Sequence, residues 1–271
     1  MDLQLYGKKA LVTGSSKGIG EAIVRKLAQE KAIVVVHGRD RAKAENVANE
    51  ITAQGGHAYV MVGDLTDDAD VQRLVEGAVQ LAGPIDILIN NAGGSGGSKE
   101  SWANTQPGSW ASAYDRNVLA ALRVTKLLLP GMQQARWGRV INISSLAATM
   151  PPPTAPDYSA CKAAMNAMTA SMAKAVAADG ITVNAVSPGT IHSSALDSRF
   201  REVAAERGVA NKDAPWEVIE RAVLPMFAQV PVGRVGRLDE IADAIAFLAS
   251  PLAGYITGVN LRIDGGLSPS L

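Results

Sequence analysis

The segment Thr13-Gly14-Ser15-Ser16-Lys17-Gly18-Ile19-Gly20 joins an apolar, strand-like stretch at residues 10–13 to a helix-like stretch at residues 18–30. Apolar residues recur at helical spacing along the second stretch. Glycines at these positions permit a tight turn and a close approach of the backbone. The helix N-terminus would then offer free N–H groups to a phosphate. The segment predicts a dinucleotide-binding turn, although three glycines alone could also be an ordinary turn.

The same alternation of strand-like and helix-like stretches continues along the chain. Strands are expected at 10–13, 32–37, 58–62, 85–89, 139–143, 182–186 and 259–263, and helices at 18–30, 40–54, 67–81, 110–135, 157–178 and 238–249. Near-continuous apolar strands separated by helices indicate a parallel sheet that is covered on both faces. We therefore expect an α/β protein with a single domain over residues 1–271, whose doubly wound, seven-stranded parallel sheet carries helices on both faces. Its ligand site should lie beyond the carboxyl ends of the strands.

Composition excludes several classes of protein. Lys+Arg and Asp+Glu both number 26, so the net charge is zero, and no field of one sign is available to hold nucleic acid or an anionic membrane. No apolar run approaches the roughly 20 residues of a membrane span, and residues 1–9 do not resemble a signal peptide. The only cysteine is Cys161, which excludes an internal disulfide and fits a reducing compartment. We expect a cytoplasmic protein that binds neither nucleic acid nor membrane. The three histidines, His37, His57 and His192, lack metal-ligand spacing, so no metal is expected.

Further motifs follow the later strands. The glycine spacing is Gly-x-x-x-Gly-x-Gly, and the chain then presents, in order, Asp64, Asn90-Asn91-Ala92-Gly93, Asn117, Ser144-Ser145, Tyr158-x-x-x-Lys162, Pro188-Gly189 and Ile263-Asp264-Gly265-Gly266. With these motifs in this order, the chain resembles the classical branch of the short-chain dehydrogenase/reductase family over nearly its whole length, and in particular its 3-oxoacyl reductase-like members. The resemblance implies a Rossmann-type fold and an oxidoreductase that uses a nicotinamide cofactor.

The choice of cofactor can be argued from the end of the second strand, His37-Gly38-Arg39. A dinucleotide without a 2′-phosphate is usually held by an acidic residue near this point. Here Gly38 occupies that place, Arg39 follows it, and Lys17 of the glycine turn could reach the same phosphate. Two cations and no carboxylate favour NADP(H) over NAD(H). Alternatively, Lys17 and Arg39 are solvated surface charges, and Asp40 lies close enough to confuse the assignment.

By resemblance, residues after the third, fourth and sixth strands should also border the cofactor. The expected cofactor contacts are Gly14, Ser16, Lys17, Gly18, Ile19, Gly20, Arg39, Asp64, Leu65, Asn91, Ala92, Gly93, Tyr158, Lys162, Pro188, Gly189, Thr190 and Ile191. Plainer interpretations remain open for two of them. Asp64 could be a turn residue that caps a helix, and Asn90-Asn91-Ala92-Gly93 could be a turn that ends a strand.

Tyr158 and Lys162 are the candidates for proton transfer. Four residues apart on an expected helix, they share a face, and a nearby ammonium lowers the pKa of a tyrosine. Tyr158 could then protonate a carbonyl oxygen or deprotonate an alcohol. In the family the reacting serine stands thirteen residues before the tyrosine, which indicates Ser145. Ser144 should make backbone bonds. By resemblance Asn117 kinks its helix and supports a proton path through Lys162; alternatively it is a buried amide bonded to backbone.

Residues 190–236 are expected to form a lid over the substrate, or alternatively two surface helices that pack on the core. Arg199, Arg201 and Arg207 could hold an anionic substrate there, although scattered arginines are more often solvated, and His192 could touch substrate. By resemblance the protein should be a homotetramer with the 157–178 helix and the C-terminal strand in its interfaces.

The sequence therefore predicts an NADP(H)-dependent oxidoreductase that passes a hydride between the nicotinamide and a carbonyl or secondary alcohol of a small-molecule substrate. A 3-oxoacyl thioester, a cyclic ketone and a sugar-derived ketone are all candidates, because fold and motifs do not separate them. The alternatives are an NAD(H)-linked alcohol dehydrogenase and a cofactor-binding sensor or scaffold without turnover.

Overall fold

The computed structural model describes residues 2–95 and 101–269. In this part of the chain, seven strands form one sheet in the order β3-β2-β1-β4-β5-β6-β7, and every neighbouring pair is parallel. The strands are β1 (Lys9–Val12), β2 (Ile33–Gly38), β3 (His57–Val62), β4 (Ile87–Asn90), β5 (Gly138–Ile143), β6 (Ile181–Pro188) and β7 (Asn260–Ile263). The predicted Rossmann-type, seven-stranded parallel sheet is confirmed, with strand limits within about two residues of those expected.

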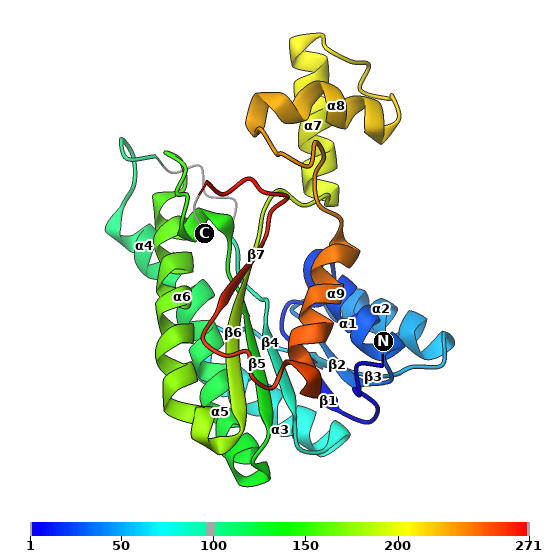
Figure 1. Ribbon diagram of the computed structural model, residues 1–271, viewed down its shortest axis with the longest axis vertical. Coiled ribbons are helices and arrows are strands. Elements are labelled where there is room, and N and C mark those ends of the chain that lie inside the picture. The colour runs from blue at the N-terminus through cyan, green and yellow to red at the C-terminus, as the bar shows by residue number, and fades with distance from the viewer. Residues whose placement is uncertain (1, 96–100, 270–271) are drawn as a thin grey trace.

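Helices cover both faces of the sheet, as Figure 1 shows. One apolar core joins the sheet to α1 (Gly18–Gln29), α2 (Arg41–Ala53) and α9 (Leu238–Ala249). A second core joins the opposite face to α3 (Asp68–Ala82), α5 (Ala120–Ala135) and α6 (Pro156–Val176). The fully buried residues of β1 and β4 divide between the two cores, since alternate side chains of a strand point to opposite faces. This double cover explains why these strands are apolar throughout.

The strand order reverses between β1 and β4. From β1 the chain builds outward through β2 and β3, then returns to place β4 on the other side of β1. Crossovers that leave in opposite directions open a crevice beyond the carboxyl ends of the central strands, which is where ligands bind in open α/β sheets. The glycine turn, Asn91 and Ser145 all follow the carboxyl ends of strands at or beside this reversal.

The prediction of one continuous helix at residues 110–135 is wrong. It is divided into α4 (Pro107–Tyr114), a single π-helical turn η1 (Asp115–Leu119) and α5. Pro107 begins the helix three residues earlier than expected, at a position where its missing N–H costs nothing. The π turn inserts one extra residue into the helical repeat, and such turns are frequent at functional sites.

Two helices stand away from the sheet. Figure 1 shows α7 (Ser194–Arg207) and α8 (Trp216–Phe227) beyond the carboxyl ends of the strands, projecting from the body. They pack on one another through a cluster that includes Phe200, Ile219 and Val223. The alternative of two surface helices packed on the central core is therefore wrong, because their apolar faces are buried mainly against each other. No helix in the described part of the chain combines the length and apolarity that crossing a bilayer requires.

Candidate active site

The turn between β1 and α1 has space only for glycine at two points. Gly14 has a φ of +64°, and a Cβ there would lie 2.9 Å from Cα of Ala92. A Cβ on Gly20 would lie 2.4 Å from the carbonyl oxygen of Gly14 and 2.5 Å from Nδ2 of Asn91. The N-cap residue of α1, Lys17, makes no side-chain capping bond, so the first N–H groups of α1 remain available. This uncapped helix with a tight turn in front of it fits the pyrophosphate of a dinucleotide.

Sequence reasoning missed the residue on which this turn rests, His37. Its side chain is only 2% exposed. Nδ1 accepts a hydrogen bond of 3.0 Å from the backbone N–H of Gly14, and Nε2 lies 3.2 Å from the carbonyl oxygen of Gly63. The backbone of His37 also exchanges bonds with Ser15. The sequence did contain a feature that could have indicated His37: it is a histidine near the end of a buried apolar strand, and this strand neighbours the glycine turn.

Beyond the turn, a hollow of about 360 Å³ opens where β2 meets α2. A Cβ on Gly38 would lie 2.8 Å from Oγ of Ser16, which lines the hollow, so this close approach requires glycine at the end of β2. Its lining includes Ser16, Asp40 and Lys43. Lys43 is a cation that sequence reasoning did not single out. Its position in the first turn of the helix after β2 could have indicated it. The hollow therefore offers hydroxyl and ammonium donors near the expected 2′-phosphate.

Asp40 is occupied as the N-cap of α2. Its carboxylate accepts a bond from the backbone N–H of Lys43 at 3.2 Å and lies 3.3 Å from Nζ of Lys43. The first of these bonds, with the Lys43 ammonium next, lowers the pKa of Asp40. Arg39 is exposed and forms no hydrogen bond or ion pair with the residues that the structure describes. The guanidinium of Arg39 is thus available to a ligand, whereas the carboxylate of Asp40 is already bonded to Lys43.

Asp64 and Asn91 both have structural partners. The carboxylate of Asp64 accepts bonds from the backbone N–H and the hydroxyl of Thr66 at 2.9 and 2.8 Å, and these bonds lower its pKa. Nδ2 of Asn91 donates to the carbonyl oxygens of Thr13 and Gly14, both at 2.9 Å. Asn91 thereby ties the end of β4 to the glycine turn. Asp64 forms a turn with Thr66 but does not cap a helix, because Asp67 is the N-cap of α3. The turn considered for the Asn91 segment is present and leaves the backbone of residues 91–93 beside the crevice.

Ser145 and Tyr158 meet beyond the end of β5. Tyr158 lies in the first turn of α6, and Ser145 precedes the short 3-10 turn η2 (Leu146–Ala148). The Ser145 hydroxyl lies near enough to the Tyr158 phenol to lower its pKa, and Ser145 Oγ accepts a hydrogen bond from the N–H of Ala147 at 3.1 Å. Ser144, in contrast, donates to the carbonyl oxygen of Lys162, as expected for a serine bonded to backbone. The structure thus brings together the serine and the tyrosine that the thirteen-residue spacing indicates.

The pKa of Tyr158 differs from our expectation. Burial raises it, and the hydrogen bond from Ser145 lowers it by less. The predicted lowering by Lys162 is wrong for this arrangement, because the ammonium lies 5.6 Å from the centre of the tyrosine ring and is bonded elsewhere. A raised pKa keeps the phenol protonated near neutral pH, the form that can donate a proton.

Lys162 is a buried cation. Its side chain is 3% exposed, and Nζ donates to the carbonyl oxygen of Ile143 at 2.7 Å and lies 3.5 Å from Sδ of Met165. Burial lowers its pKa to about 8, because an ammonium loses solvation in an apolar setting. Lys162 is therefore held at the end of β5, one helical turn from Tyr158.

Asn117 lies in the π turn and is fully buried. Its amide closes the loop after β4, because Oδ1 accepts from the N–H of Gly94 at 2.8 Å while Nδ2 donates to the carbonyl oxygens of Gly94 and Ala113. A Cβ on Gly93 would lie 2.6 Å from Oδ1 of Asn117. The buried amide bonded to backbone, which we considered as the alternative, is what the structure shows. No direct bond joins Asn117 to Lys162 in the described residues.

The segment Pro188–Ile191 runs between β7 and the turn before α9. The N–H of Gly189 donates to the carbonyl oxygen of Ile263, and a Cβ on Gly189 would lie 2.8 Å from Cα of Asp264. Ile191 forms a parallel bridge with Gly236. Both ends of the expected lid are thus fastened to the sheet, immediately beyond the carboxyl end of β6.

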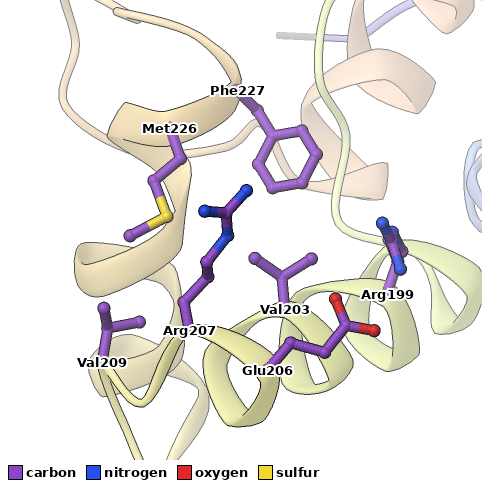
Figure 2. Close-up of a pocket in the computed structure, with 7 residues that line it drawn as sticks. All are labelled: Arg199, Val203, Glu206, Arg207, Val209, Met226 and Phe227. Carbon is purple, nitrogen blue, oxygen red and sulfur yellow. The ribbon is translucent and has the colours of Figure 1, made fainter.

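The lid carries a groove between α7 and α8 of about 620 Å³, shown in Figure 2. It is lined by Arg199, Val203, Glu206, Arg207, Val209, Met226 and Phe227. Arg201 points elsewhere, since it bonds Asp197 at 2.6 Å and the carbonyl oxygens of Lys212 and Ala214. The structure does not bring the three candidate arginines together, so a shared anion site for them is wrong.

His192 lies at the base of the lid. Its ring stacks on Trp216 with 4.0 Å between ring centres, and Nε2 is 3.3 Å from Oδ2 of Asp197. The ring of His192 is therefore held by residues of α7 and α8. Within residues 2–95 and 101–269, no three His, Cys, Asp or Glu side chains are grouped so that they could hold a metal ion.

The comparisons with known proteins agree with this geometry. Residues 8–204 match the family model described as short chain dehydrogenase. The chain is 33% identical over 265 residues to the 3-oxoacyl-acyl-carrier-protein reductase FabG of Pseudomonas aeruginosa, which covers 98% of this chain and 99% of that protein. The FabG of Haemophilus influenzae is 36% identical, with 97% and 99% covered. The solved structure of L-sorbose reductase from Gluconobacter frateurii, a complex with NADPH and L-sorbose, superposes with a TM-score of 0.91 at 31% identity over 100% of both chains.

Proposed function

The chain belongs to the short-chain dehydrogenase family, and from this premise we propose that it is an NADP(H)-dependent ketoreductase in which Tyr158 transfers the proton. As a member it is an oxidoreductase that acts on a C=O or CH–OH group with a nicotinamide cofactor. The observation that carries the proposal is that Ser145 and Tyr158 lie together beyond the end of β5, with the Lys162 ammonium buried one helical turn away.

In the proposed mechanism the side chains bind, orient and move one proton. Ser145 donates a hydrogen bond to the substrate carbonyl oxygen and steadies the charge that develops there. Tyr158 gives its phenolic proton to the same oxygen, and burial supports this role because it raises the pKa and keeps the proton in place. Lys162, whose ammonium is bonded to the carbonyl oxygen of Ile143, holds the end of β5 beside the first turn of α6. The nicotinamide, when bound, supplies the hydride.

The proposed preference for NADP(H) is supported by the corner where β2 meets α2. Arg39 is free, Lys43 lines the hollow, and Asp40 is engaged as a cap. The second candidate, NAD(H), is favoured by the carboxylate of Asp40, which lies in the same hollow and could accept bonds from a ribose. Dissociation constants of NADPH and NADH for Arg39→Ala distinguish them. We expect about tenfold weaker NADPH binding with NADH unchanged; equal, small effects on both would favour NAD(H).

We propose a ketone of the kind found in 3-oxoacyl thioesters as the first substrate class, because two of the similar proteins are named as such reductases over nearly the whole chain. The test is oxidation of NADPH and NADH, followed by absorbance, against 3-oxoacyl thioesters, cyclic ketones and L-sorbose, with Tyr158→Phe alongside. Turnover that is lost in Tyr158→Phe supports the mechanism. Tight NADPH binding without turnover of any substrate would instead favour a cofactor-binding sensor.

We also propose a homotetramer that works in the cytoplasm. Strand β7 is an edge of the sheet, and Val259 just before it and Leu261 on it are 40% and 37% exposed. On α5, Leu122 and Leu127 are 46% and 36% exposed. An apolar sheet edge is a template for pairing with a second copy, and exposed leucines on one helix suit the same use. Light scattering on the purified protein tests the assembly, and a monomeric mass would refute it.

A further inference from the structure

We infer that His37 is a positioning residue which holds the glycine turn in the shape that the dinucleotide needs, and that it does so as the neutral ring with its proton on Nε2. The inference rests on the proposed binding of NADP(H) at that turn. His37 itself is 2% exposed, and its two ring nitrogens are bonded to backbone groups, so it is not a contact of the cofactor in this proposal.

The position of the proton follows from its two partners. A backbone N–H can only donate, so the Nδ1 that faces the N–H of Gly14 at 3.0 Å must carry a lone pair. A carbonyl oxygen can only accept, so the Nε2 that lies 3.2 Å from the oxygen of Gly63 must carry the proton. One ring form satisfies both contacts. The bond made by one ring nitrogen thus sets the state of the other.

His37 holds the turn by its backbone as well. The N–H of Ser15 donates to the carbonyl oxygen of His37 at 2.7 Å, and the N–H of His37 donates to Oγ of Ser15 at 2.9 Å. That hydroxyl in turn donates to the carbonyl oxygen of Val12. The ring bond to Gly14 is the third link between these two segments. It fixes Gly14, whose φ of +64° lies in the left-handed region that favours glycine.

Protonation would break this arrangement. An imidazolium has N–H groups at both nitrogens, so Nδ1 would face the N–H of Gly14 as a second donor, in a site that is 2% exposed. The charged groups that act on the ring are Asp64 after β3, which favours the cation, and Arg39 after β2, which opposes it. Burial outweighs both and lowers the pKa of His37 below its ordinary value. The glycine turn presents to the ring only a backbone amide.

The variants that isolate the bond are His37→Asn and His37→Leu. The two side chains branch at the same atom, but only asparagine can place an acceptor near the Nδ1 position. We expect His37→Leu to weaken NADPH binding about tenfold and His37→Asn to stay within about threefold of the unchanged protein, as measured by nicotinamide fluorescence. His57→Asn, on an exposed residue of β3, is the matched control and should have no effect.

A second readout is independent of how well the variants fold. Because burial lowers the pKa of His37, the ring of the unchanged protein should still be neutral, and NADPH should still bind, when the pH falls from 7.5 to the ordinary histidine pKa of 6.5. A long-range proton–nitrogen NMR spectrum should show His37 as the Nε2–H form at pH 7.5. An Nδ1–H form, or an imidazolium at pH 6.5 and above, would overturn the inference. No NADPH binding by the unchanged protein at any pH would instead overturn the proposed function.

Discussion

The phenol of Tyr158 is the residue on which the chemistry depends most directly. Replacing it in Tyr158→Phe removes one oxygen and keeps the ring. We expect kcat to fall by about 10²- to 10⁴-fold, the usual contribution of a positioned proton donor, while the NADPH dissociation constant changes by less than about threefold. Steady-state kinetics and fluorescence titration measure the two. Tyr6→Phe, on an exposed tyrosine far along the sequence, is the control, and an equal loss of kcat in both variants would contradict the role.

Lys162 gives a prediction about stability and pH. Its pKa of about 8 in the folded protein lies below the ordinary 10.5, because burial penalises the ammonium. Below pH 8 the folded state therefore bears the full penalty, and between pH 8 and 10.5 the unfolded chain binds more protons, so stability rises with pH. We expect Lys162→Met to be the more stable protein at pH 7 by roughly 3 kcal/mol, given 1.36 kcal/mol for each pKa unit.

The measurement is urea unfolding of Lys162→Met and the unchanged protein at pH 7 and pH 10. The difference should shrink toward pH 10. Lys174→Met changes an exposed lysine on the same helix and should show no such trend. A difference that is equal at both pH values would mean that the ammonium is not penalised by burial.

At the scale of elements, the glycine turn and α1 depend on the absence of a side chain at Gly20. In Gly20→Ala the new Cβ would meet the carbonyl oxygen of Gly14 at 2.4 Å and Nδ2 of Asn91 at 2.5 Å. Both belong to the turn, so the turn must shift. We expect NADPH binding to weaken by at least tenfold and the melting temperature to fall.

The matched control is Gly131→Ala in α5, where nothing lies within 4 Å of the added Cβ. There alanine should raise stability by about 0.5–1 kcal/mol, the cost of glycine in a helix interior. Isothermal titration with NADPH and a thermal melt give both quantities. Tight NADPH binding by Gly20→Ala would show that the turn can adjust.

Elements also show where sequence reasoning reached its limit. The apolar strands and most helix limits could be predicted, because each pattern is local. The division of the helix at 110–135 could not be predicted. The π turn holds Asn117, whose amide exchanges hydrogen bonds with Gly94, and Gly94 lies in a different loop. The bond from His37 to Gly14 spans 23 residues and was missed for the same reason. Motif spacing predicts Ser145, Tyr158 and Lys162 as the reacting group, whereas the burial that raises the pKa of the tyrosine depends on the folded chain.

At the scale of the whole molecule, the sheet with its covering helices and the pair α7 and α8 have separate apolar cores. The buried apolar residues of α1, α2 and α9 and of α3, α5 and α6 join the sheet. The cluster of α7 and α8 shares no residue with those cores. Sequence could predict the lid as a segment without strand pattern, but its apolar residues did not reveal that they bury one another. We propose that α7 and α8, with a core of their own, act as a lid that moves as a unit.

Ile219 and Ile245 test that separation, because both are fully buried but lie in different cores. Each change to alanine removes a similar amount of buried packing and should lower the free energy of unfolding of the core that it affects by about 2–5 kcal/mol. We expect Ile245→Ala in α9 to lower the stability of the whole molecule and to weaken NADPH binding. Ile219→Ala in α8 should instead loosen the lid, so that KM for the ketone rises several-fold while the NADPH dissociation constant stays unchanged.

Hydrogen exchange followed by mass spectrometry reports where each change acts. Faster exchange confined to residues 194–227 in Ile219→Ala, and spread over the sheet in Ile245→Ala, is the expected outcome. If Ile219→Ala instead speeds exchange throughout the sheet, the helices of the lid are part of the cooperative core, and a lid that moves as a unit is not a property of this fold. Because the comparison uses the same residue type and the same depth of burial, only the location of the core can produce the difference.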